Sequence, residues 1–301
     1  MTPGWFDLGD VSVVPIVETP RLLIAPEEFF PGVPVDRDEW CFREPWFDAA
    51  SGRLVYTIQS FLVVTPTATV LVDACVGGGK PRLRPEFADL DAGWLAALHA
   101  TGTSPLDVTT VVLTHLHVDH VGWCTQEQGR EWQPVFRNAR HLVTGPELAY
   151  WTGAEGTIAM RRTGDYMADS VAPLLAHGLL DVVEPDAVVA PGVRLEPAFG
   201  HTPGNVVVRV TGSAGELVLA GDAMHHPVQL RHPEVSTRYC VDPAAAARTR
   251  VRLLADAAGS GTPVVPAHFA VPTAGRVEPA GSGYTFHAPM DMLRTNWYVR
   301  S

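Results

Sequence analysis

In the 301-residue sequence, no run of lysines or arginines offers a basic stripe. Its 22 lysines and arginines are outnumbered by 33 aspartates and glutamates, which gives a formal net charge of −11 at pH 7. Binding to a phosphate backbone requires a basic stripe or patch. We therefore expect no nucleic-acid partner.

Long apolar segments are also missing, because no window approaches the roughly 20 apolar residues that span a bilayer. The first residues, "MTPGWFDLGD", have neither a basic leader nor an apolar stretch. The four cysteines are widely separated and form no CxxC pair, so neither a zinc knuckle nor a dithiol redox site is indicated. We expect reduced thiols in a cytoplasmic protein that has no membrane partner.

Two common catalytic signatures are absent. No G-x-S-x-G occurs, so a serine nucleophile on a strand-to-helix elbow has no support. The stretch "GGGKP" resembles a phosphate-binding loop, but Ala74 stands where such a loop needs its first glycine, and Pro81 replaces the serine or threonine. A nucleotide site at this loop is therefore not expected.

Short β-branched runs alternate with segments of helical spacing along the chain. They predict strands over 53–65, 68–74, 107–115, 139–144, 192–199, 205–212, 216–222 and 262–268. Helices are expected over 90–100, 146–152, 165–177 and 243–258, the last capped by Asp242 and opened by Pro243. Since no long polar linker divides the chain, residues 1–301 are expected to form one α/β domain with two mixed sheets flanked by helices.

Residues 1–51 precede the first of these strands and are expected to form an N-terminal extension. Within it, residues 25–50 are irregular and rich in proline and aromatic residues. Such a segment can act as a lid over a site, as a contact in a homodimer, or as a surface loop held by its own aromatic side chains. The sequence leaves all three alternatives open.

The stretch "LTHLHVDHVGW" places four ligand-type residues directly after an apolar run, namely His115, His117, Asp119 and His120. Residues two apart in an extended segment point the same way, so His115 and His117 can reach one ion. Asp119 and His120 lie where the chain turns toward a helix and can face a second ion. Nitrogen and oxygen donors of this kind suit a catalytic metal.

Four residues cannot complete two metal sites, so a dinuclear centre needs further ligands at other strand ends. The sequence supplies three of them. His201 lies in "FGHTPG" between two predicted strands, Asp222 ends the strand "ELVLAGD", and His268 ends the strand "TPVVPAH". One sheet edge could therefore gather all seven residues.

In the order and spacing of these motifs, the chain resembles the metallo-β-lactamase fold superfamily over roughly residues 52–278. The resemblance implies a four-layer αββα sandwich. It also implies that one metal is held by His115, His117 and His201, and a second by Asp119, His120 and His268, with Asp222 bridging both. Because Asp119 is present and Asp222 is not a cysteine, the pattern is closer to acyl-homoserine lactonases and methyl parathion hydrolases than to true β-lactamases.

The expected activity is the metal-dependent hydrolysis of a small-molecule ester, a lactone or a carboxylic ester, by a hydroxide that bridges two divalent ions. Zinc is the expected metal, and iron, cobalt and manganese suit the same donors. Asp119 and Asp222 are the expected catalytic residues, with Asp119 orienting the hydroxide and carrying a proton to the leaving group. Two alternatives remain, a phosphotriesterase and a mononuclear-iron sulfur dioxygenase of the same fold.

Other residues near the motifs have weaker assignments. His226 is a candidate substrate contact, as is His225 to a lesser degree, and the alternative for both is hydrogen bonding within a loop. Asp73 either orients one of the histidines or caps a turn. Tyr166 and Tyr239 could donate to a substrate carbonyl, but no motif aligns either one with that role.

Overall fold

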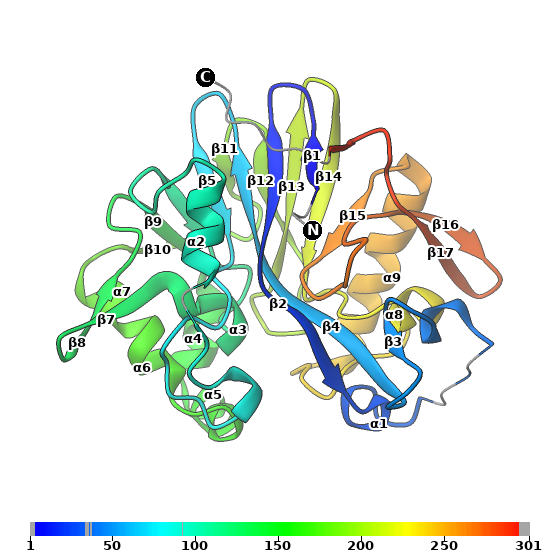
Figure 1. The fold of residues 1–301 in the computed structure, drawn as a ribbon, viewed down its shortest axis with the longest axis horizontal. Coiled ribbons are helices and arrows are strands. Elements are labelled where there is room, and N and C mark those ends of the chain that lie inside the picture. The colour runs from blue at the N-terminus through cyan, green and yellow to red at the C-terminus, as the bar shows by residue number, and fades with distance from the viewer. Residues whose placement is uncertain (1–3, 34–35, 37, 92, 295–301) are drawn as a thin grey trace.

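Two β-sheets lie face to face at the centre of the molecule, and helices cover their outer surfaces (Figure 1). The structure is a computed structural model that describes residues 4–33, 36, 38–91 and 93–294. This layered arrangement confirms the predicted fold class. Among the described residues there is no helix whose length and hydropathy would let it cross a bilayer.

The first sheet contains nine strands within the described residues. In spatial order they are β10 (Leu180–Val183), β9 (Arg140–Thr144), β6 (Thr110–Val112), β5 (Thr69–Val72), β4 (Arg53–Val64), β2 (Ser12–Ile24), β1 (Trp5–Asp7) and β18 (Leu293–Arg294), with β3 (Phe47–Asp48) paired to β4. Pairing is parallel from β10 to β5 and antiparallel from β5 to β18, so the sheet is mixed.

The second sheet is smaller and also mixed. Its described strands run in the order β11 (Val188–Ala190), β12 (Val193–Pro197), β13 (Val206–Gly212), β14 (Gly215–Gly221) and β15 (Val264–Pro266). The first four pair antiparallel, whereas β14 and β15 pair in parallel. Two separate hairpins are formed by β7 (Thr125–Gln128) with β8 (Glu131–Pro134) and by β16 (Arg276–Ala280) with β17 (Gly283–His287).

Successive side chains of the second sheet point to opposite faces, and both faces are covered. In β13, Val206, Val208 and Val210 pack into the core between the sheets. Val207 points the other way and joins the cluster that contains Leu254 of the long helix α9 (Pro243–Ser260). Since successive side chains of a strand point to opposite faces, a continuous valine run predicts a strand that is buried on both sides.

The helices are short apart from α9. They are α1 (Pro26–Phe29), α2 (Gly93–Ala100), α3 (Val118–Val121), α4 (Gly145–Thr152), α5 (Ala154–Ala159), α6 (Tyr166–Ser170), α7 (Ala172–Ala176) and α8 (Val228–Arg231), with 3-10 turns η1 (Trp40–Phe42), η2 (Pro85–Phe87), η3 (Gly122–Cys124) and η4 (Met160–Arg162). As predicted, the Asp242 side chain caps α9 by accepting a 2.9 Å hydrogen bond from the Ala245 amide.

The single helix predicted over 165–177 is wrong, because the chain breaks between α6 and α7. Pro173 has no amide hydrogen, so it cannot donate to the carbonyl of Asp169 as a continuous helix would require. That carbonyl instead accepts from the buried side chains of Lys80 and Thr125. The break therefore follows from a missing backbone donor and from competing side-chain donors.

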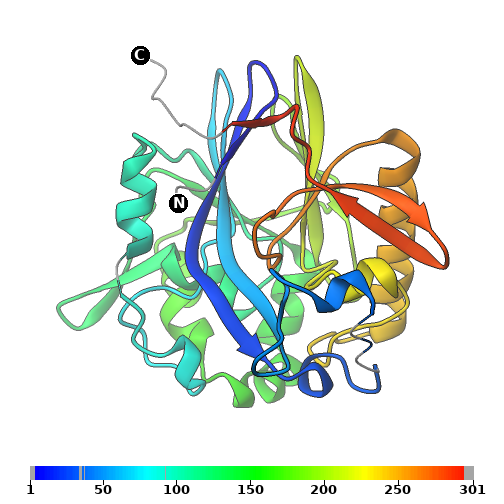
Figure 2. The same cartoon turned by 45° about the vertical axis from the view of Figure 1, so that its right-hand side comes forward.

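Part of the expected N-terminal extension belongs to the first sheet, where it forms β1, β2 and β3. Strand β2, which the periodicity analysis did not predict, pairs with β4 from Ser12 to Ile24, and Figure 2 shows these two long strands side by side, with α1 beyond their ends. Of residues 25–50, positions 34, 35 and 37 lie outside the described residues. Phe29 from this segment is buried and lines the cavity described below.

Candidate metal centre

All seven residues singled out by the motifs meet at one end of the two sheets. His115 and His117 follow β6, Asp119 and His120 belong to α3, and His201 lies in the loop between β12 and β13. Asp222 directly follows β14, and His268 lies two residues beyond β15. The strand ends thus bring together side chains that are separated by as many as 153 positions in the sequence.

The first set of donors consists of His115, His117, His201 and Asp222. The Nδ1 atom of His117 lies 2.9 Å from Nε2 of His115 and 2.8 Å from Nε2 of His201. The Oδ2 atom of Asp222 lies 3.1 Å from the same nitrogen of His201. Three ring nitrogens and one carboxylate oxygen therefore converge on a single point.

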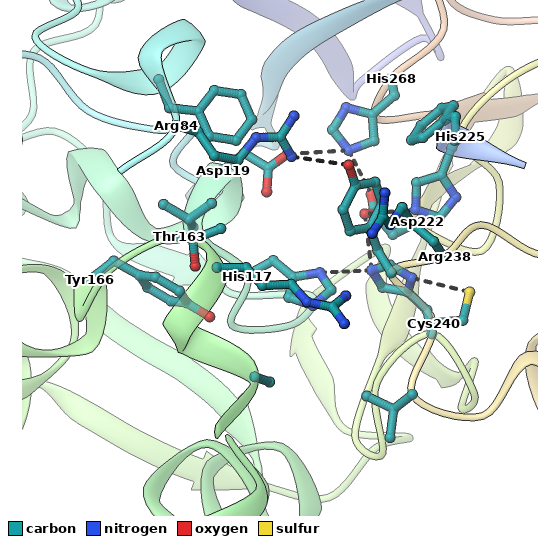
Figure 3. A pocket seen from close by; sticks show the side chains of 18 of the residues that line it. Arg84, His117, Asp119, Thr163, Tyr166, Asp222, His225, Arg238, Cys240 and His268 are labelled. Carbon is teal, nitrogen blue, oxygen red and sulfur yellow. Dashed lines mark hydrogen bonds and ion pairs between the residues drawn. The ribbon is translucent and has the colours of Figure 1, made fainter. Parts of the chain in front are cut away.

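The second set consists of Asp119, His120 and His268. Nε2 of His268 lies 3.7 Å from Oδ2 of Asp119, and Nε2 of His120 lies 4.0 Å from Oδ1 of the same carboxylate. Figure 3 shows Asp119, Asp222 and His268 facing one another across this set. The side chains of His120 and His268 are buried, while that of Asp119 is half-buried and borders the cavity.

Asp222 lies between the two sets, with one carboxylate oxygen turned toward each. Its Oδ2 faces His115 and His201, at 3.5 and 3.1 Å. Its Oδ1 faces His120 and His268, at 3.3 and 3.1 Å. A carboxylate placed in this way can contact two cations at once, which is the bridging role expected from the resemblance.

The protonation pattern of the second set fits cation binding. His120 donates from Nδ1 to Oδ2 of Asp73 at 2.8 Å, and His268 donates from Nδ1 to the Thr57 carbonyl at 2.8 Å. With Nδ1 as the donor, the neutral form of each ring presents an unprotonated Nε2 to the centre. Nε2 of His120 and Oδ1 of Asp222 are buried and have no well-aligned hydrogen bond among the described residues. A buried ring nitrogen and a buried carboxylate oxygen that lack hydrogen-bond partners can serve as ligands to a divalent cation.

Asp73 orients the loop as well as the ring of His120. It follows β5 with a positive φ of 61°. This conformation is strained for a residue other than glycine, and such strain is typical of functional positions. Its carboxylate accepts from the Thr114 amide at 2.9 Å and from the Thr114 hydroxyl, which is itself 3.1 Å from Nδ1 of His115. Of the two roles expected for Asp73, the structure shows the orientation of a histidine.

The motif analysis missed Glu147, a fully buried carboxylate in the first turn of α4. It accepts from the Leu116 amide, inside the first histidine motif, at 2.9 Å and from the Gly204 amide, inside "GHTPG", at 2.9 Å. The indole of Trp151 donates to it at 2.6 Å. Glu147 therefore ties together two loops that carry His115, His117 and His201.

The close approach of Glu147 also explains the last glycine of "GHTPG". A Cβ atom at Gly204 would lie 2.3 Å from the Glu147 amide nitrogen and 2.3 Å from Oγ1 of Thr144. Any side chain at this position would push the two loops apart. Nothing in the local sequence distinguishes Glu147 from an ordinary acidic residue in the first turn of a helix.

The electrostatics of the site are dominated by burial and by Asp222. Burial lowers the pKa of His115 and of His117 well below the usual value for histidine. Burial opposes charge on His120 as well, but Asp222 and Asp73 outweigh it and raise the pKa of that ring. Burial also disfavours charge on Asp222, yet the surrounding histidines hold its pKa well below the usual range. The carboxylate is therefore ionised and attracts cations.

The two neighbouring histidines after Asp222 have different surroundings. His225 lines the cavity, with Nε2 3.1 Å from Oδ2 of Asp222. His226, the predicted substrate contact, lies outside the cavity lining, where its Nε2 is 2.8 Å from the Trp46 carbonyl and its Nδ1 accepts from the Val228 amide. His226 thus has the hydrogen bonding within a loop that was the alternative to a substrate contact. The chain turns between the two, so adjacent residues face opposite ways.

A cavity of about 460 Å³ opens over both sets of donors. Apolar and aromatic side chains form much of its lining, including Ile24, Phe29, Tyr56, Phe87, Trp151 and Ile158. Four arginines also line it: Arg84, Arg161, Arg162 and Arg238. A small organic molecule of roughly drug size fits a cavity of this volume and character.

Comparison with protein families gives one match. The family model described as the Metallo-beta-lactamase superfamily matches residues 54–268, which is more than half of the chain. The matched segment begins in β4 and ends at His268, so it includes all seven residues of the candidate centre.

Two curated relatives are N-acyl homoserine lactonases. One, from Bacillus sp., is 27% identical over 129 residues, which cover 42% of this chain and 43% of that protein. The other, AiiB from Agrobacterium fabrum (strain C58), is 28% identical over 204 residues, which cover 60% of this chain and 68% of that protein. The chain therefore matches less than half of the first relative's length.

Solved structures share the fold over nearly the whole chain. The hydrolase AbOPH, of the beta lactamase superfamily, has a TM-score of 0.78 and 24% identity, covering 95% of this chain and 98% of that one. AidC, a dizinc quorum-quenching lactonase solved with the product N-hexnoyl-L-homoserine, has a TM-score of 0.78 and 20% identity, covering 95% and 97%. At these identities the likeness establishes the fold.

Proposed function

Because this chain belongs to the metallo-beta-lactamase superfamily, we propose that it is a dinuclear metal-dependent hydrolase of small esters. A lactone or a carboxylic ester is the proposed substrate. The donor sets at the floor of the cavity support this proposal, as do relatives named as N-acyl homoserine lactonases.

The residues that would hold the ions follow from the two donor sets. His115, His117 and His201 would bind one ion, and Asp119, His120 and His268 the other, with Asp222 contacting both. When bound, two divalent ions of this kind supply a hydroxide nucleophile at neutral pH and polarise the oxygen of the electrophile. Zinc is the proposed metal, since imidazole and carboxylate donors suit it, although they also suit iron, cobalt and manganese.

Asp119 is the proposed proton carrier. Its carboxylate is half-buried at the cavity, whereas that of Asp222, which also lines the cavity, is buried among histidines. It can accept a proton from the nucleophile and deliver that proton to the oxygen of the leaving group. Asp222 holds the two donor sets together while His225, 3.1 Å from it, faces the bound ester.

The observation that carries the proposal is the position of Asp222 between the two sets. A mononuclear centre, as in an iron dioxygenase of this fold, needs only one of them. Here Oδ1 and Oδ2 of one carboxylate each lie 3.1 Å from a histidine of a different set. Two ions therefore account for the arrangement better than one.

A hydrolysis screen of the metal-replete protein tests the proposal. Lactones, aryl esters, thioesters and phosphotriesters should be assayed together, with oxygen uptake on a persulfide as the arm for a dioxygenase. We expect turnover of lactones or carboxylic esters that is abolished by a chelator and restored by added zinc. Turnover of the persulfide alone, with oxygen consumption, would contradict the proposal.

A further inference from the structure

One wall of the cavity comes from a single short stretch of chain, residues 158–166, which we call the cationic wall. It contributes Ile158, Arg161, Arg162, Thr163 and Tyr166 to the cavity lining. The stretch runs from α5 through η4 into α6. In Figure 3, Thr163 and Tyr166 lie across the cavity from His225 and Cys240, with His117 between them.

The charges around the cavity are not balanced. Arg84 is hydrogen-bonded to Glu86, and Arg238 lies 3.9 Å from Glu28. Arg161 and Arg162 are exposed, and neither side chain forms a hydrogen bond or an ion pair with any described residue. Of the described residues that line the cavity, the only carboxylates are Asp119 and Asp222, and both belong to the candidate metal centre. A chain of net charge −11 therefore concentrates unpaired positive charge at this opening.

A second observation concerns a buried donor on the same wall. The Tyr166 side chain is 1% exposed, and its hydroxyl has no hydrogen-bond partner among the described residues. Burial raises the pKa of Tyr166 well above its usual value of 10, so the hydroxyl keeps its proton and can donate. Buried hydroxyls without a partner are rare in folded proteins, and one that borders a cavity suits a ligand acceptor.

We propose that the cationic wall binds a carboxylate on the substrate, so that the preferred esters carry a negative charge away from the bond that is cleaved. Arg161 and Arg162 supply the charge, and the Tyr166 hydroxyl supplies a hydrogen bond. The apolar lining, which includes Ile158 and Phe29, holds the chain that joins the carboxylate to the ester. This inference rests on the proposed ester hydrolase activity.

Two chromogenic esters with one leaving group provide the test. The 4-nitrophenyl esters of pentanoate and of glutarate have the same chain length, and the second carries a carboxylate in place of the terminal methyl group. We expect kcat/KM to be about tenfold higher for the glutarate ester at low ionic strength, as two exposed charge contacts can provide. The preference should shrink as salt is added.

Substitutions in the cationic wall test whether it is the source of the preference for the glutarate ester. The double variant Arg161→Gln/Arg162→Gln should abolish the preference, mainly through a higher KM for the glutarate ester. Tyr166→Phe should reduce it by about threefold, because the hydroxyl then no longer donates to the carboxylate that the two arginines hold at the wall. Arg130→Gln is the matched control, since Arg130 is an exposed arginine in the β7–β8 turn that does not line the cavity.

Binding of the two product acids, measured by calorimetry on the metal-replete protein, separates this inference from the proposed function. Tighter binding of glutarate than of pentanoate, lost in the double variant, supports the cationic wall even if neither ester is hydrolysed. Equal binding of the two acids, or a preference that survives in the double variant, overturns the inference. Hydrolysis of the neutral ester alone leaves the proposed function intact and also overturns the inference.

Discussion

The floor of the cavity, which is formed by the two donor sets, differs from the cationic wall in how firmly its side chains are fixed by burial and hydrogen bonds. On the floor, His120 and His268 are buried, and each donates to a fixed acceptor, Asp73 or the Thr57 carbonyl. On the wall, Arg161 and Arg162 are exposed on a single 3-10 turn and lack partners among the described residues. The floor is thus arranged before any ligand arrives, whereas the wall leaves its charges available to one.

Metal binding and substrate recognition differ in how precisely their side chains must be placed. A metal centre requires donors within a few tenths of an ångström of their places, which only packed strand ends and a hydrogen-bonded surrounding layer provide. Recognition of a substrate tolerates mobile side chains on a loop carried by a rigid scaffold. Substitutions on the floor should therefore change turnover or metal affinity, whereas substitutions on the wall should change KM and substrate preference.

The largest effect is expected for Asp119→Asn. The substitution keeps the shape of the side chain but removes the proposed proton carrier, so kcat should fall by about 10²- to 10⁴-fold. Turnover and metal content should be measured on the same preparation. Unchanged kcat in a metal-replete variant would remove Asp119 from the mechanism. It would also contradict the expectation that substitutions on the floor change turnover.

Next in size is Asp73→Asn. The amide cannot carry the negative charge that faces Nδ1 of His120, so metal affinity should fall by about 10- to 100-fold. Competition with a chromogenic chelator measures this affinity directly. Asp186→Asn, a change at an exposed aspartate, is the control. Equal affinities in the two variants would show that Asp73 does not hold the ring of His120 in place.

Glu147→Gln should have a smaller effect that appears first in stability. Glutamine offers one acceptor oxygen where the Leu116 and Gly204 amides and the Trp151 indole now bond to two. One buried donor is left unpaired, which costs about 1–3 kcal/mol in the free energy of unfolding. Glu155→Gln, in exposed α5 beside the wall, should have no such effect. If Glu147→Gln were as stable as the native chain, Glu147 would not be the residue that holds the two loops together.

At neutral pH the smallest effect is expected at His226, because its contribution to stability changes only as the pH falls below about 6.5. Burial lowers the pKa of His226 to about 4, so the folded chain keeps this ring neutral while the unfolded chain protonates it below about 6.5. Its stabilising contribution is therefore present above pH 6.5 and is lost as pH falls toward 4, at up to about 1.4 kcal/mol per pH unit. Urea unfolding of His226→Gln across this window should show a shallower decline than that of the native chain.

The neighbouring residue provides the contrast for this measurement. His225→Gln should change kcat/KM, because His225 lines the cavity, while His226→Gln should leave kcat/KM of the folded, metal-replete protein unchanged. Exposed His177→Gln controls for the loss of a histidine as such. A change in kcat/KM for His226→Gln alone would support the prediction that this residue contacts the substrate.

The sequence predicted the residues of the two donor sets far better than the residues that surround them. Ligand-type residues at strand ends follow a local pattern, so "HLHVDH", "GHTPG" and the two later strand ends could be expected at one sheet edge, and the family resemblance divided them into two sets. Glu147 could not be found in this way, because its partners Leu116 and Gly204 are 31 and 57 positions away. Only the folded chain reveals such contacts.

The misassignments have related causes. The helix predicted over 165–177 ignored Pro173, whose missing amide separates α6 from α7. The choice between His225 and His226 depends on a turn that has no regular period, so no spacing rule applies. Strand β2 was missed because its apolar residues give way to "ETPR", although its pairing with β4 continues past this segment with shifts in register. Only at β2 does long-range pairing override local composition.

The central claim is that two ions bind at the floor of the cavity. Elemental analysis of protein that has never met a chelator tests it directly, with Asp222→Ala as the variant that should lose metal from both sets. The account predicts close to two divalent ions per native chain. A native content of one ion or fewer would contradict it.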